Sequence, residues 1–164
     1  MEDLKEVNLR EIDPREILGP IAHIYRNNLA YMTKELETHR IGSGQFEFLL
    51  FLYHKDGVSQ ETIAKTLKVS KSTIARAIQN LEKEGYVYRE RDKSDLRAYR
   101  VYLTDKGKEM RNIIFKKQAS FTDILFSDFT FEEKEIFRLL IHKASIKLFE
   151  PGLESPSDRL NDMK

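Results

Sequence analysis

Two short helical segments separated by only two residues constrain this fold more than any other feature of the sequence. Ser59 can cap the first segment and Ser70 the second, Lys68 and Val69 lie between them, and Gly85 follows the second. The apolar residues with helical spacing are Ile63, Ala64 and Leu67 in the first segment and Ile74, Ala77, Ile78 and Leu81 in the second. So tight a connection between two capped helices predicts a helix-turn-helix.

A β-hairpin is predicted directly after the second helix. Residues 86–91 (YVYRER) and 99–103 (YRVYL) are rich in aromatic and β-branched side chains, which favour strands, and the polar segment 92–98 forms the turn. Residues 45–54 (QFEFLLFLYH) are apolar on nearly all sides, which is typical of a short buried helix. Together these segments predict a winged helix-turn-helix over residues 42–104.

A long helix is predicted before this region. Asp13 followed by Pro14 is a typical helix start, and apolar residues then recur with helical spacing to about His39. Because Pro20 lies inside this segment, we expect a kink or an irregular first turn.

Two further helices are predicted after the hairpin. Thr104 caps a helix over residues 105–128, and Thr130 with Glu133 forms a capping box for a helix over residues 131–149. The expected fold class is therefore mainly α with a small β-hairpin (α+β), in which N- and C-terminal helices flank a winged helix-turn-helix.

The composition limits the location and the chemistry of the chain. No apolar run is long enough to cross a membrane and the acidic first residues do not resemble a signal peptide, so we expect a soluble, cytoplasmic protein. The absence of cysteine excludes disulfides, thiolate zinc sites and thiol-based redox sensing. The net charge is only +1, but residues 65–81 hold four cationic side chains and no carboxylate. Cationic charge is thus concentrated at the helix-turn-helix.

The outward face of the second helix has side chains that can bind DNA. Hydroxyl, amide and guanidinium groups make directional hydrogen bonds to base edges in the major groove, and the first amides of a helix favour a phosphate. The candidate residues here are Ser70, Lys71, Ser72, Thr73, Arg76, Gln79 and Lys83. The alternative for these residues is a plain solvated helix face, which has a similar composition. The alternative for the function of the chain is a winged helix that binds another protein and not a specific DNA sequence.

Residues 45–107 resemble the MarR family of winged-helix regulators. The resemblance is carried by VSQETIAKTLKVSKSTIARAIQNLEKEGYVYRERD (58–92), by the Asp95-Leu96-Arg97 motif of the wing and by YLTDKGKE (102–109). It implies that Asp95 holds Arg97 for insertion into the minor groove. The other cationic wing residues that we expect at DNA are Lys93 and Arg100. Leu96 and Lys93 depart from the family, which often has a polar residue and a proline at these positions.

The resemblance also implies a homodimer in which the first and the last two helices of each chain interlock. The apolar stripes of these helices include Phe121, Phe137 and Phe149, and a small winged helix cannot bury all of them. A closed monomeric bundle is the alternative. The expected segments of this single domain are a flexible N-terminus (1–13), a dimerisation helix (14–41), the winged helix-turn-helix (42–104), two dimerisation helices (105–150) and a disordered tail (151–164).

The expected function is a transcriptional regulator, a repressor on a palindromic DNA site, that a small aromatic or phenolic ligand releases. His23, Tyr25 and Arg26 are the candidate ligand residues, because they combine an aromatic face with cationic or hydrogen-bonding groups. The four histidines lack metal-ligand spacing and no catalytic or nucleotide-binding motif is present, so we expect no enzyme, no metal and no cofactor.

Overall fold

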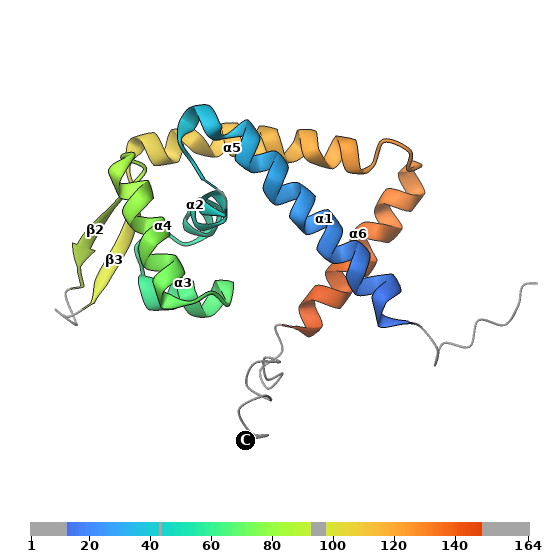
Figure 1. Ribbon diagram of the computed structural model, residues 1–164, viewed down its shortest axis with the longest axis horizontal. Coiled ribbons are helices and arrows are strands. Elements are labelled where there is room, and N and C mark those ends of the chain that lie inside the picture. Colours follow the sequence, from blue (N-terminus) through green and yellow to red (C-terminus); the bar gives the residue numbers. More distant parts are fainter. Residues whose placement is uncertain (1–12, 43, 93–97, 149–164) are drawn as a thin grey trace, which may run out of the picture. The chain divides into compact units, whose positions relative to one another are not determined.

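The structure, a computed structural model, describes residues 13–42, 44–92 and 98–148 (Figure 1). It is mainly helical with a small antiparallel sheet, so the expected fold class is confirmed. The chain divides after Phe121 into two units, and helix α5 (Asp105–Leu125) passes from the first into the second.

Helix α1 (Pro14–Glu35) begins where the sequence predicts. The Asp13 carboxylate accepts a 2.9 Å hydrogen bond from the amide of Arg15 and so caps the first turn. The helix is continuous across Pro20. It ends at Glu35, earlier than expected, and a separate 3-10 turn, η1 (Glu37–His39), follows it.

The helix-turn-helix is confirmed. It consists of α3 (Gln60–Leu67) and α4 (Lys71–Lys83), and α2 (Gln45–His54) precedes it. The hydroxyls of Ser59 and Ser70 each accept a 3.1 Å hydrogen bond from the amide three residues later, which fixes both helix starts. Helices α2, α3 and α4 and the hairpin after them lie together in the first unit (Figure 1).

The hairpin belongs to a three-stranded antiparallel sheet. Strands β2 (Val87–Arg91) and β3 (Tyr99–Leu103) form the predicted hairpin, and β1 (Val58–Ser59) pairs with the other edge of β3 in the order β1-β3-β2. Val101 lies opposite Val58 on one side and Arg89 on the other. Strand β1 was not predicted, because two residues are too few to show an alternating pattern.

The core of the first unit lies between the helix-turn-helix, the sheet and parts of α1 and α5. Its fully buried side chains include Met32, Leu36, Leu49, Leu52, Ile63, Ile74, Ile78, Leu81, Tyr86 and Ile114. The first half of α5 thus belongs to this core. Gly107 approaches the sheet so closely that an added Cβ would lie 2.1 Å from the carbonyl oxygen of Tyr86.

The second unit contains the end of α5 and helix α6 (Phe131–Lys147). The predicted capping box of Thr130 and Glu133 is present at the start of α6. Phe126 contacts Phe129 and Phe137 edge-on, with ring centroids 5.2 and 5.4 Å apart. Within the described ranges, no helix is both long and apolar enough to cross a membrane.

Candidate nucleic-acid interface

Helix α4 separates its side chains into two faces, as the sequence predicts. Ile74, Ala77, Ile78 and Leu81 are buried in the core. The residues that the sequence places on the outward face are all exposed, namely Ser70, Lys71, Ser72, Thr73, Arg76, Gln79 and Lys83. The buried face fixes the rotation of α4, and the polar face is available for another molecule.

Three hydroxyl groups gather at the start of α4. The Ser70 hydroxyl lies 2.9 Å from the Ser72 hydroxyl and 2.8 Å from the Thr73 hydroxyl, besides accepting the Thr73 amide. Ser70 therefore has a structural task as the cap. Ser72 and Thr73 are held next to the positive end of the helix, where an anion is favoured.

The middle of the outward face borders a shallow hollow of about 320 Å³. Ser72, Thr73, Arg76 and Asn80 line it from α4, and Glu47 is among the α2 residues on the other side. Arg76 is thus exposed beside a concave surface rather than packed against the protein.

Lys71, the first residue of α4, forms an ion pair with α3. Its ammonium nitrogen lies 3.5 Å from a carboxylate oxygen of Glu61, which also lies 3.6 Å from the ammonium nitrogen of Lys65. The two lysines, Lys65 more than Lys71, hold the pKa of Glu61 below its usual range. Glu61 was not among the residues selected from the sequence, although it is the only carboxylate between residues 60 and 81.

The predicted wing residues lie in two different situations. Lys93, Asp95 and Arg97 fall outside the described residues. Arg100 lies on β3, where its guanidinium donates hydrogen bonds to the Asp92 carboxylate at 2.5 Å and to the Gly57 carbonyl at 2.9 Å. Asp92 is buried and directly follows β2, so Arg100 ties the turn end of the hairpin to the turn before β1.

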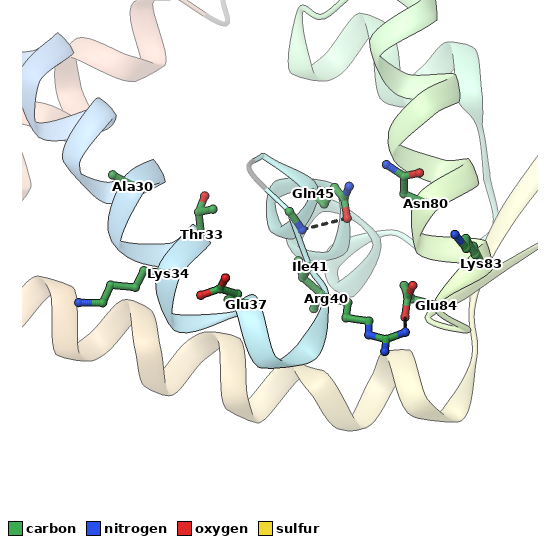
Figure 2. A pocket seen from close by; sticks show the side chains of 11 residues that line it. Ala30, Thr33, Lys34, Glu37, Arg40, Ile41, Gln45, Asn80, Lys83 and Glu84 are labelled. Carbon is green, nitrogen blue, oxygen red and sulfur yellow. Dashed lines mark hydrogen bonds and ion pairs between the residues drawn. The ribbon is translucent and has the colours of Figure 1, made fainter.

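A larger cavity, of about 510 Å³, lies at the other end of α4 (Figure 2). It is lined by the end of α1, the connection to α2, the start of α2 and the last turn of α4. Three cationic side chains (Lys34, Arg40 and Lys83) and two carboxylates (Glu37 and Glu84) line it.

Arg40 and Glu84 both line this cavity and point toward one another, with 3.7 Å between charged atoms (Figure 2). Arg40 has a left-handed backbone with a φ of 55°, an uncommon conformation for a residue other than glycine. Glu84 directly follows α4, so the pair connects the α1–α2 linker to the end of the candidate DNA-binding helix.

The candidate ligand residues His23, Tyr25 and Arg26 lie on α1 and do not line this cavity. The Tyr25 hydroxyl instead donates a 3.0 Å hydrogen bond to the Glu47 carboxylate on α2. Sequence reasoning missed Arg40 and Glu84, because the loop that brings Arg40 to the end of α4 has no local signature. Among the described residues, no group of three or more histidine, aspartate or glutamate side chains could hold a metal ion.

Comparisons with known proteins agree with this geometry. The model of the MarR family matches residues 41–99. The chain is 30% identical over 128 residues to YybA of Bacillus subtilis, named as an uncharacterized HTH-type transcriptional regulator, and the match covers 78% of this chain and 85% of that protein.

Solved structures show the same similarity. A MarR transcriptional regulator from Methanosarcina mazei is 43% identical, with a TM-score of 0.74 over 81% of this chain and 99% of that one. A MarR family regulator from Listeria monocytogenes, crystallised with a 26mer DNA, is 25% identical, with a TM-score of 0.72 over 80% of this chain and 88% of that one. The expectation of a DNA-binding regulator rather than an enzyme is confirmed, and the chain belongs to the MarR family of winged helix-turn-helix transcriptional regulators.

Proposed function

We propose that the chain is a sequence-specific repressor that binds a palindromic DNA site as a homodimer. The observation that carries the proposal is the exposed polar face of α4, in which Ser72, Arg76 and Gln79 lie opposite a fully buried apolar stripe. A helix of this kind can enter the major groove and present these groups to base edges.

A homodimer is supported by apolar surface that one chain leaves exposed. On α1 the side chains of Ile17, Leu18 and Ile21 are 47%, 63% and 43% exposed. Helix α6 buries none of its residues and exposes Phe131, Ile136, Leu139, Leu140, Ile141 and Ile146. Monomers rarely expose so many apolar residues, and a second copy can cover them in a twofold interface. Light scattering should give twice the chain mass of 19.3 kDa.

In a twofold dimer the two winged helix-turn-helix regions bind two half-sites in opposite orientation. The DNA site should therefore be palindromic. The half-sites should lie about one helical turn apart, roughly 34 Å. Bound within a promoter, such a dimer would block access of the transcription machinery and so repress. A reporter gene behind the selected site should therefore be expressed more strongly when the regulator is absent.

Arg76→Ala tests the role of α4. Arg76 is exposed, so its loss should leave the fold intact while DNA affinity falls by roughly 1–3 kcal/mol. Lys116→Ala, which removes one exposed cation from α5, is the matched control and should change affinity little. If both variants bind the selected DNA as tightly as the parent, α4 does not contact DNA through Arg76.

The alternative function, a winged helix that binds another protein, makes a different prediction. Such a module would bind a palindromic duplex weakly and with the same affinity as a random duplex. A regulator should prefer its site, and its affinity should fall steeply with salt because phosphate contacts release counterions.

The cavity beside Arg40 is the proposed site of a small aromatic acid or phenolate that releases the DNA. Its volume suits such a ligand, and the Arg40 guanidinium can bind the anion. A ligand there would contact the Arg40–Glu84 pair at the end of α4 and so disturb the orientation of this helix. Benzoate should raise the melting temperature of the parent and of His23→Ala but not of Arg40→Ala. A shift that depends on His23 and not on Arg40 would place the ligand at the residues selected from the sequence.

A further inference from the structure

Glu61 is an exception to the charge pattern of the helix-turn-helix. Residues 60–81, which contain α3 and most of α4, hold one carboxylate and four cationic side chains, Lys65, Lys68, Lys71 and Arg76. The Glu61 side chain is 57% exposed, so the core does not require it. A carboxylate on a surface that binds a polyanion opposes the attraction of its cationic neighbours.

The geometry connects Glu61 to the start of α4. Glu61 is the second residue of α3 and Lys71 the first residue of α4, so their 3.5 Å contact crosses the helix-turn-helix. Both side chains line a hollow of about 340 Å³ together with Tyr99 of β3. This hollow lies where the two helices meet the hairpin, beside the exposed face of α4.

We propose that Glu61 is an electrostatic restraint on DNA binding: it holds the Lys71 ammonium in the free protein, and a DNA phosphate must compete with it for that lysine. The inference rests on the proposed contact between Lys71 and DNA. Because an exposed ion pair is weak, a phosphate can displace it. The displaced carboxylate then remains near the DNA backbone, so the protein binds any DNA more weakly than its cationic residues alone would allow.

Glu61→Gln removes the charge and keeps the shape of the side chain. Measured by fluorescence anisotropy on a random-sequence duplex, its affinity should be about three- to tenfold higher than that of the parent at low salt. The logarithm of affinity should also fall more steeply with the logarithm of salt, because Lys71 then neutralises a phosphate fully. Glu109→Gln, the same change at an exposed position of α5, is the control and should shift affinity less than about twofold.

Lys71→Ala separates this inference from the proposed function. Lys71→Ala should weaken DNA binding. In a protein that already carries Lys71→Ala, Glu61→Gln should raise the affinity much less than it does in the parent. If Lys71→Ala weakens binding but Glu61→Gln leaves it unchanged or weaker, the restraint is overturned and the contact to Lys71 stands. If Lys71→Ala has no effect, both the contact and the restraint are overturned.

Discussion

The hydroxyl of Tyr86 donates a 2.8 Å hydrogen bond to the backbone carbonyl of His39. Tyr86 follows α4 after Gly85, and His39 ends η1, so this bond joins the end of the candidate DNA-binding helix to the connection between α1 and α2. The same corner is held by the Thr104 hydroxyl, which donates to the Gly85 carbonyl at 2.6 Å, and by the Lys106 ammonium, 4.3 Å from the centre of the Tyr86 ring.

Removing this hydroxyl should cost stability without disturbing the packing of the ring. We expect Tyr86→Phe to lower the free energy of unfolding by about 1 kcal/mol, the usual net contribution of one hydrogen bond. Tyr88→Phe, at an exposed position of β2, should change it by less than about 0.5 kcal/mol. Urea denaturation of the parent and of both variants measures these changes. If Tyr86→Phe unfolds at the same urea concentration as the parent, the hydrogen bond does not contribute to stability.

The same tyrosine should make stability depend on alkaline pH. Burial, and to a smaller degree the Glu84 carboxylate, raises the pKa of Tyr86 above its usual value of 10.0. A raised pKa means that the folded state favours the neutral phenol. The contribution of the neutral Tyr86 phenol to the free energy of unfolding is therefore fully present below pH 10.0. It is lost as the pH rises through the pKa of Tyr86 in the folded state. The stability advantage of the parent over Tyr86→Phe should accordingly shrink as the pH rises above 10.0. An advantage that stays constant across this range would contradict the raised pKa.

Gly107 should tolerate no side chain. An added Cβ would lie 2.1 Å from the Tyr86 carbonyl oxygen, so Gly107→Ala has to move α5 away from the sheet. We expect a loss of about 2–3 kcal/mol in the free energy of unfolding, typical of overpacking. Thermal unfolding of Gly107→Ala should therefore occur at a lower temperature than that of the parent. An unchanged midpoint would contradict the close approach of α5 to Tyr86.

Arg100 should contribute more to stability than Arg89, although both form ion pairs. Arg100→Met removes the hydrogen bonds that Arg100 donates to the buried Asp92 carboxylate and to the Gly57 carbonyl, and we expect a loss of about 1–3 kcal/mol. Arg89 pairs with Glu82 at 2.6 Å at the surface, so Arg89→Met should cost less than about 1 kcal/mol. Equal losses in urea denaturation would show that the hairpin does not depend on the Arg100 contacts.

Local signals in the sequence predicted most of the fold. Ser59, Ser70 and Thr130 cap the helices that their positions indicate, and the buried stripe of α4 matches the apolar spacing. These predictions are correct because a cap or a helical stripe is decided by residues within a few positions of one another.

The remaining features depend on residues far apart in the chain. Arg100 contacts Gly57, 43 positions earlier, and Arg40 meets Glu84 only because a left-handed turn brings the linker to the end of α4. No spacing rule predicts such pairs. His23, Tyr25 and Arg26 were selected as ligand residues by chemistry alone, and this selection stays a prediction. The sequence could not indicate the cavity beside Arg40, because its lining comes from segments far apart in the chain.

Selection of bound sequences from a random DNA pool tests the central claim most directly, namely that α4 reads a palindromic site. The pool should be exposed to the parent and to Arg76→Ala at the same salt concentration, because affinities at different salt cannot be compared. We expect the parent to enrich a palindrome with half-sites about one helical turn apart, and Arg76→Ala to lose preference at defined positions within each half-site. An unenriched pool, or the same enrichment with both proteins, would show that α4 does not read a palindromic site through Arg76.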